Sequence, residues 1–339
     1  MGLNAINSVV SNARSGLQKM AQQYSDILKS LNHNVLNVGV GKCLSNSGFD
    51  LIIKNSGHYD WLAKFRAGRL INKNKIDVVF CHCSRSVSIF CPFKKKVLVV
   101  AVPHTHNLKR FLKADYFIAI SGIVQQRLLE SGVSQSKIAL IYNSVRLNFS
   151  NMKNIQNNQI IKFGFLGRLD ANKNVEFLLN VIVGMKKKGL EPKFIIGGEG
   201  PLENELKEVS KVLKIEDNVS FRGWVDKDDF FKQIDCLLFP SFNEVMPLTI
   251  IEAFGIGIPV VSNKYVGFSD PFNSNNLYLL DGLIFSEWVD LCFSIASGSI
   301  NTEFILSRAR DTYLNNFSES RMKDSLPSNL DAWILLKGE

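Results

Sequence analysis

The sequence predicts an α/β fold made of two doubly wound domains that face each other across a cleft. Apolar runs of strand length alternate with amphipathic helical segments along most of the chain. Strands that are apolar throughout fit a parallel sheet covered by helices on both faces. The 339 residues are also too many for one hydrophobic core and enough for two of about 150 residues each.

The first half, residues 1–148, is expected to form one of these domains. Its opening strand, 3–11, is less apolar than the others, and a helix within 15–34 follows it. Apolar runs then predict strands, separated by helix or loop, at 35–40, 76–80, 96–102 and 116–121.

The second half repeats the pattern after a polar, amide-rich stretch at 149–159, which is expected to be a linker. Residues 160–312 are expected to form the second domain, and 313–339 a helical segment that packs back on the first. Strands are predicted at 160–167, 193–198, 218–223 and 235–241. Helices are predicted from Val175 to Gly189, where apolar residues recur at helical spacing, and from Pro201 to Lys214.

Charge is divided unevenly between the halves. Residues 1–150 carry 20 Lys and Arg against 6 Asp and Glu, and the remainder carry 20 against 25. A basic half indicates an anionic partner such as nucleic acid, phospholipid or a phosphorylated substrate.

The remaining composition indicates a cytoplasmic protein with six reduced cysteines. No apolar run reaches the roughly 20 residues that span a bilayer, and the first residues lack the pattern of a secretory signal. The triplet Cys81-His82-Cys83 is not followed by a second ligand pair at zinc-finger spacing. We therefore expect no metal site.

The loop after the strand at 160–167 carries two cations, Arg168 and Lys173. In a parallel sheet, ligands bind where strands end and helices begin. Arg can hold two phosphate oxygens in a fork while Lys adds a mobile charge, which suits a diphosphate. The alternative is a pair of solvated surface cations.

The segment 242–262 places two carboxylates around one predicted helix. Pro247 fits the first turn of this helix and Gly255 its end, so Glu244 lies in the loop before it and Glu252 inside it. A carboxylate can accept hydrogen bonds from two neighbouring hydroxyls of a ribose or hexose, and the amides of the first turn can bind phosphate. The alternative for Glu252 is an ordinary polar position on a helix face.

These segments resemble the retaining glycosyltransferases of family 4, also called glycosyl transferases group 1, which have the GT-B fold of two Rossmann-like domains. The similarity is strong over residues 160–265 and includes a paired-glutamate motif with seven residues between Glu244 and Glu252. It implies that Glu252 binds the ribose and Glu244 the transferred sugar. It further implies acceptor binding by the domain of residues 1–148 and nucleotide-sugar binding by the domain of residues 160–312. The implied donor-binding residues are Arg168, Lys173, Pro247, Leu248, Thr249 and, in the first loop, Gly16.

Two features depart from the family pattern or leave a choice open. Val245 follows the first glutamate, where a glycine is usual. The resemblance also implies a histidine near the transferred sugar, at His104 or His106. We prefer His106 as the catalytic residue because it precedes Asn107 and a basic run, whereas His104 adjoins Pro103.

The resemblance implies retaining transfer from a UDP- or GDP-linked sugar to a hydroxyl of a glycan or lipid-linked acceptor, in cell-surface polysaccharide or lipopolysaccharide synthesis. No cofactor or metal is expected, because no Asp-any-Asp triplet is placed at a strand end. The alternatives are another GT-B enzyme, such as an epimerase or phosphorylase, and a non-enzymatic nucleic-acid-binding protein. Aromatic residues are not interleaved with the basic ones, which argues against nucleic acid.

A basic, aromatic-bearing helical stretch at 59–70 is suited to an anionic membrane surface. The alternative is a solvated basic face with its apolar side in the core. We expect peripheral attachment at the inner face of the cytoplasmic membrane. The residues in question are Lys64, Arg66, Arg69, Lys94, Lys95, Lys96, Lys109, Arg110 and Lys113, with Trp61, Leu62, Phe65 and Leu70 as the apolar side.

Overall fold

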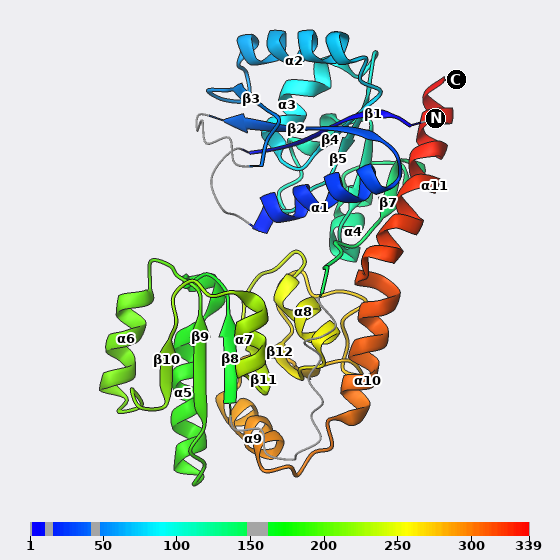
Figure 1. Cartoon of the computed structure of the whole chain (residues 1–339). Helices are drawn as coiled ribbons and strands as arrows, with labels where there is room; N and C mark the ends of the chain where they lie inside the picture. Colours follow the sequence, from blue (N-terminus) through cyan, green and yellow to red (C-terminus); the bar gives the residue numbers. More distant parts are fainter. Residues whose placement is uncertain (1, 11–15, 42–47, 148–161, 339) are drawn as a thin grey trace. The chain divides into compact units, whose positions relative to one another are not determined.

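The computed structural model describes residues 2–10, 16–41, 48–147 and 162–338. The chain forms two compact units, one of Met1–Ser144 with Glu319–Glu339 and one of Val145–Ser318 (Figure 1). The expected linker at 149–159 lies outside the described residues.

The first unit is built on a seven-stranded sheet in the order β3-β2-β1-β4-β5-β6-β7, with every pair parallel. The polar opening strand β1 lies inside the sheet, between β2 and β4. The strands are β1 (Asn4–Val10), β2 (Asn34–Gly41), β3 (Leu51–Lys54), β4 (Val78–Cys81), β5 (Leu98–Ala101), β6 (Tyr116–Ala119) and β7 (Ile138–Leu140).

Helices complete the first unit, and the last helix of the chain belongs to it. Trp333 of that helix stacks on Tyr116 with ring centroids 5.0 Å apart, so the C-terminal segment is held by aromatic packing. The helices are α1 (Gly16–Ser30), α2 (Trp61–Asn74), α3 (Ser84–Phe90), α4 (Gly122–Glu130) and α11 (Glu319–Gly338), with 3₁₀ turns η1 (Cys91–Phe93), η2 (Phe111–Lys113) and η3 (Gln135–Lys137).

The second unit has a six-stranded parallel sheet in the order β10-β9-β8-β11-β12-β13. Its core includes Trp288, whose ring meets Phe177 edge-on at 5.5 Å. The strands are β8 (Lys162–Leu166), β9 (Lys193–Gly197), β10 (Val219–Phe221), β11 (Cys236–Phe239), β12 (Val260–Asn263) and β13 (Tyr278–Leu280).

The helices of the second unit follow the predicted alternation with shifted ends. The helix expected to start at Pro201 begins two residues later, at Glu203, and the one expected to end at Gly255 continues to Ile256. The elements are η5 (Ala171–Lys173), α5 (Val175–Lys187), α6 (Glu203–Val212), α7 (Lys227–Gln233), α8 (Leu248–Ile256), α9 (Phe285–Ala296), α10 (Glu303–Thr312) and the π-helical turn η6 (Tyr313–Phe317). The predicted α/β class with two parallel sheets is confirmed.

Candidate active site

Two loops at the carboxyl edge of the second sheet are joined through their backbones. Gly167 N–H donates to the Gly197 carbonyl at 3.0 Å, and Leu169 N–H donates to the Glu199 carbonyl at 3.0 Å. A Cβ on Gly198, which has a φ of +120°, would lie 1.9 Å from the Gly167 carbonyl oxygen. This glycine therefore permits the loops after β8 and β9 to lie in contact.

The structure pairs two of the predicted site residues directly. The Lys173 ammonium, on η5, contacts the Glu244 carboxylate in the loop before α8, and both side chains are largely buried. The same ammonium lies 5.5 Å from the centroid of the Phe239 ring, a favourable cation–π position. The pair thus joins the loop after β8 to the loop after β11.

Backbone and amide contacts hold these two loops in register. Asn172 donates from Nδ2 to the Asn243 carbonyl at 2.9 Å, and its own carbonyl accepts from Phe242 N–H at 2.9 Å. Because of these bonds, the position of Lys173 beside Glu244 does not depend on the ion pair alone.

Arg168 differs from Lys173 in exposure. Its side chain is 72% exposed, and its only ion pair in the described part of the chain is a long one, 3.6 Å from Nε to Asp170 Oδ2. Exposed ion pairs of this kind contribute at most about 1 kcal/mol. The guanidinium is therefore available to an anion that arrives from solvent.

The helix α8 starts at this same edge. Pro247 is its N-cap and carries no side-chain cap, and the N–H groups of Ile250 and Ile251 bond to the Pro247 carbonyl. The first-turn amides of Leu248 and Thr249 have no acceptor within the helix, because a helix cannot supply one there.

The C-terminal cap of α8 corrects the sequence prediction. Gly257, with a φ of +86°, is the cap, and Gly255 lies inside the helix. A Cβ on Gly255 would meet Leu147 at 2.0 Å and the Tyr313 ring at 3.0 Å. This glycine is needed for close packing, which the sequence does not distinguish from a helix end.

Glu252 is 6% exposed, and its carboxylate contacts the ammonium of Lys227 at the start of α7. The sequence reasoning did not include Lys227. Its only signal was a basic residue at the start of a helix that follows a strand. The preceding Asp226 caps α7 by accepting from the N–H groups of Asp228 and Asp229.

Tyr265 is a second residue that the sequence reasoning missed. It is 5% exposed, and its ring meets Phe239 edge-on at 5.9 Å. Burial, together with the nearby Glu244 charge, raises the pKa of its phenol well above the usual value. The phenol therefore stays protonated near Glu244 at neutral pH.

Val245, in the place of the usual glycine, does not have a positive φ, so its side chain causes no backbone strain.

The first unit contains a chain of hydrogen bonds between polar side chains where β4 and β5 end, and all of its members except the half-buried His104 are buried. Asn7 Nδ2 donates to the Ala21 carbonyl at 2.7 Å and to Asn37 Oδ1 at 3.0 Å, so Asn7 Oδ1 must accept. His82 therefore donates from Nε2 to Asn7 at 2.8 Å. Its other nitrogen, Nδ1, lies 3.1 Å from Nε2 of His104.

Burial determines the protonation of both rings. It lowers the pKa of His82 well below the usual value, with a further contribution from His104, and lowers the pKa of His104 to about 4. Both rings are neutral at pH 7, so His82 Nδ1 accepts and His104 Nε2 donates. His104 then keeps its proton on Nε2 and a lone pair on Nδ1.

The predicted residues His106 and Gly16 also lie in the first unit. The backbone carbonyl of His106 accepts from Arg127 Nη1 at 3.2 Å. Gly16 begins α1, and a Cβ there would meet nothing within 4 Å. Sequence reasoning preferred His106, whereas the structure places His104 in the buried chain. The choice between them as a catalytic residue stays a prediction.

Two parallel-sheet α/β units with charged loops at a carboxyl edge define a protein of the GT-B class, and comparisons of the fold agree. The lipopolysaccharide outer core galactosyltransferase WaaB in its apo form has a TM-score of 0.76 at 17% identity, over 98% of this chain and 100% of its own. HepE from Anabaena, in complex with UDP, has a TM-score of 0.80 at 16% identity, over 97% and 100%. At these identities the likeness shows the fold.

Family models identify the chain more closely. Residues 44–149 match Glycosyltransferase Family 4 and residues 161–287 match Glycosyl transferases group 1. The chain therefore belongs to the glycosyltransferases that these two models describe.

Two curated relatives illustrate the range of similarity. An uncharacterized 41.2 kDa protein in the cps region of Klebsiella pneumoniae is 31% identical over 66% of this chain and 62% of its own length. A lipopolysaccharide 1,6-galactosyltransferase of Escherichia coli (strain K12) is 27% identical over 48% and 46%. The chain thus spans less than two thirds of the length of each of these relatives.

Proposed function

We propose that this protein transfers a sugar from a nucleoside-diphosphate sugar to a hydroxyl of a glycan or lipid-linked acceptor, with retention of anomeric configuration. The observation that carries the proposal is the group formed by the Lys173–Glu244 pair, the exposed Arg168 and the start of α8 at one sheet edge. Cations and uncapped amides suit a diphosphate, and a carboxylate beside them suits sugar hydroxyls.

In this proposal the protein acts by positioning and by charge stabilisation. Arg168, Lys173 and the amides of Leu248 and Thr249 hold the diphosphate as negative charge develops on it, and such contacts are worth roughly 2.7 to 4 kcal/mol each. The acceptor hydroxyl attacks from the face that the nucleotide leaves. Protein cations take the place of a divalent ion, so no metal is proposed.

Each glutamate has a distinct role in this scheme. Glu244 orients Lys173 through their contact and binds hydroxyls of the transferred sugar. Glu252 binds the ribose hydroxyls, and its contact with Lys227 places a positive charge beside the buried carboxylate.

UDP is the proposed donor nucleotide, with a polysaccharide or lipopolysaccharide precursor as the acceptor. HepE has been solved with UDP-glucose, and the pneumococcal O-GlcNAc transferase GtfA with UDP and GlcNAc. Relatives in sequence include lipopolysaccharide galactosyltransferases. The family matches favour a transferase over the epimerase, phosphorylase and nucleic-acid-binding alternatives.

A thermal-shift comparison of UDP, GDP and ADP tests this function. A ligand at 100 times its dissociation constant stabilises the folded state by roughly 2.7 kcal/mol, which raises the melting temperature measurably. We expect the largest shift with UDP and a smaller one with Arg168→Ala protein. Identical melting temperatures with all three nucleotides and without any would contradict the proposal.

Attachment to an anionic membrane is part of the proposal, and α2 supports it. The helix packs on the first unit through Ala63, Ala67 and Ile71, while Trp61 and Phe65 are 71% and 59% exposed. Leu62 is exposed as well, so the alternative that these apolar side chains lie in the core is wrong.

Small residues explain which side of α2 packs inward. A Cβ on Gly68 would lie 2.8 Å from the Phe93 ring, which shows how closely the helix approaches its neighbour. The larger side chains of Trp61, Leu62 and Phe65, with Arg66 and Arg69 beside them, are left on the outer side. A helix with exposed aromatics and cations fits the interface of an anionic bilayer. Among the described residues, no helix is both long and apolar enough to span a membrane.

A further inference from the structure

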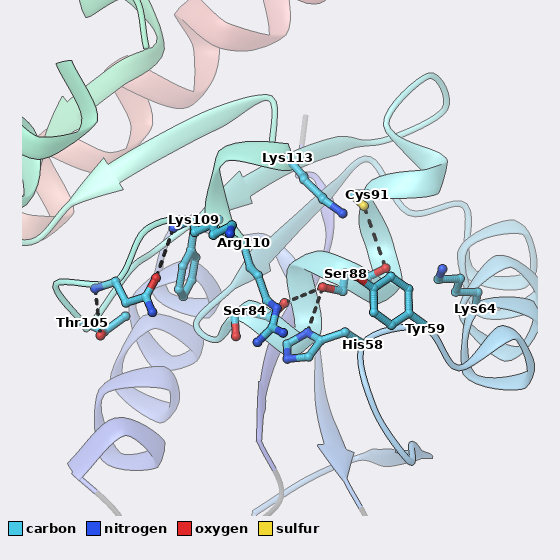
Figure 2. A pocket seen from close by; sticks show the side chains of 12 residues that line it. His58, Tyr59, Lys64, Ser84, Ser88, Cys91, Thr105, Lys109, Arg110 and Lys113 are labelled. Atoms are coloured by element: carbon cyan, nitrogen blue, oxygen red, sulfur yellow. Dashed lines mark hydrogen bonds between the residues drawn. The ribbon is translucent and has the colours of Figure 1, made fainter. Parts of the chain in front are cut away.

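The first unit contains a pocket of about 650 Å³ that the proposed function has not used. Figure 2 shows how it is enclosed by the segment before α2, by α2 and α3, and by the chain after β5. Pockets that hold small molecules have volumes of about 300 to 1,000 Å³. The side chains that matter below are Lys64, Lys109, Arg110 and Lys113, with His58, Tyr59 and Ser88.

The pocket is lined by cations and by no acid. Lys64, Lys109, Arg110 and Lys113 all border it, and none of these four forms an ion pair with any carboxylate that the structure describes. The acids nearest in the sequence are engaged elsewhere. Asp60 accepts from the N–H groups of Ala63 and Ser56 at the N-terminus of α2, and Asp115 accepts from Val99 N–H and pairs with Lys337. The positive charge in the pocket is therefore not neutralised by neighbouring side chains.

The same positive charges act on His58, which also lines the pocket. Burial lowers the pKa of its imidazole below the usual value, and the charges of Arg110, Arg85 and Lys113 lower it further. Ser88 donates its hydroxyl hydrogen to the Ser84 carbonyl at 2.9 Å, so it accepts from His58 Nδ1 at 3.0 Å. The neutral ring then carries its lone pair on Nε2, the atom that can take up a proton.

We propose that this pocket binds a phosphate or diphosphate group of the acceptor. The inference rests on the proposed function: the residues proposed to hold the donor all lie in the second unit, which leaves the first unit to receive the acceptor. Arg110 supplies a planar fork of donors for phosphate oxygens, and Lys64 and Lys113 supply mobile charges. Tyr59, whose side chain is 82% exposed, offers a ring face to the sugar attached to that phosphate.

Titration calorimetry with inorganic pyrophosphate tests the site. Pyrophosphate also resembles the diphosphate of the donor. The parent protein for the comparison therefore carries Arg168→Gln, a substitution expected to weaken pyrophosphate binding in the second unit. Adding Arg110→Gln and Lys113→Gln should raise the dissociation constant at least tenfold, since hydrogen bonds to charged groups commonly contribute that much. The matched control adds Lys95→Gln and Lys96→Gln, which remove the same charge from exposed positions outside the pocket.

The outcomes separate the pocket from a general effect of positive charge. A change of less than twofold in the control supports the site. Equal weakening in both variants, or no binding of pyrophosphate to the parent, would overturn it. Melting temperatures of all variants within about 3 °C of the parent exclude unfolding as the cause.

Proton uptake provides a second measurement. A bound anion offsets the charges of Arg110, Arg85 and Lys113 that face His58, so binding should raise the pKa of His58. Near pH 6, calorimetry in two buffers of different ionisation enthalpy measures the protons exchanged per pyrophosphate, which itself also titrates near this pH. The parent should therefore take up a fraction of a proton more, or release a fraction less, than His58→Gln protein. Uptake unchanged by His58→Gln would contradict the placement of the anion beside this ring.

Two further arms identify the source of the phosphate. In the first arm, the protein is mixed with neutral phosphatidylcholine vesicles that carry a polyprenyl diphosphate sugar. If the parent binds these vesicles and the Arg110/Lys113 variant does not, the pocket is assigned to a lipid-linked acceptor. Binding of glucose 1-phosphate in solution without such recruitment assigns it to a soluble one, and failure of both overturns the inference. UDP binding to the wild-type protein is measured in parallel. If UDP binds but pyrophosphate does not bind to the Arg168→Gln parent, only the pocket is rejected. If UDP does not bind either, the proposed function is rejected.

Discussion

The Lys173 ammonium contacts the Glu244 carboxylate across 71 positions of sequence. Their side chains are 19% and 15% exposed, so the pair is shielded from water yet adjoins the edge where the donor is proposed to bind. A pair in this setting both stabilises the loops and holds each charge in place for a ligand.

We expect this pair to show strong coupling in a double-mutant cycle. Lys173→Met or Glu244→Gln alone should lower the free energy of unfolding by about 1 to 3 kcal/mol, because each leaves a partly buried charge without its main partner. The double variant should lose clearly less than the sum. Urea denaturation measures all four proteins. Additive losses would mean that the contact contributes nothing.

The two glutamates should separate in nucleotide affinity. Glu252→Gln should weaken UDP binding about tenfold or more, because the ribose hydroxyls lose a charged acceptor. Glu244→Gln should leave UDP affinity within about threefold, because the Asn172 bonds still hold the loop that carries Lys173. It should abolish turnover, because Glu244 is proposed to bind the transferred sugar. Calorimetry and a transfer assay measure the two effects. UDP affinities that are the same in both variants would refute the division of roles.

Arg168 and Lys173 should carry the charge stabilisation that a metal supplies in other enzymes. Arg168→Ala should reduce turnover about 10² to 10³-fold with little change in melting temperature, since its side chain is mostly exposed. Wild-type activity should persist in a chelator. Activity that a chelator abolishes and added divalent metal restores would show that an ion has been overlooked.

The buried histidines predict a loss of stability in acid. Burial lowers the pKa of His104 to about 4 and that of His82 well below the usual value. As the pH falls from about 6.5, the unfolded state gains protons that the folded state does not, so the free energy of unfolding falls by about 1.4 kcal/mol per pH unit for each ring. For His104 this continues down to about pH 4.

Urea denaturation at pH 7 and pH 5 measures this dependence. His104→Gln should reduce the difference between the two pH values by about 2 kcal/mol, while His33→Gln serves as a control for a less buried histidine. A wild-type slope that His104→Gln leaves unchanged would show that the ring is not held neutral.

The exposed side of α2 predicts binding to anionic vesicles. Trp61→Ser with Phe65→Ser should weaken co-sedimentation with phosphatidylglycerol vesicles, whereas Val212→Ser, which removes an equally exposed apolar side chain from the second unit, should not. Binding should also weaken between 0.1 M and 1 M salt, as the Debye length falls from about 10 Å to about 3 Å. Absence of low-salt binding in the wild type would favour a soluble acceptor.

The sequence by itself determined the elements and the class of the fold. Apolar runs between amphipathic segments are local patterns, and burial on both faces of a parallel sheet requires them. Positions next to strand ends, such as Arg168 and Lys173, follow from the same patterns. So does the spacing of Glu244 and Glu252 around the start of α8.

Only the tertiary structure decided which of these side chains meet. The pairs Lys173–Glu244 and Lys227–Glu252, and the bond from His82 to Asn7, join residues that are 71, 25 and 75 positions apart. Such contacts depend on strand order, which no local period encodes. Likewise, the sequence left open whether the apolar side of α2 faces a membrane or the core. Close packing through Ala63, Ala67 and Gly68, the last against the Phe93 ring, left Trp61 and Phe65 outside.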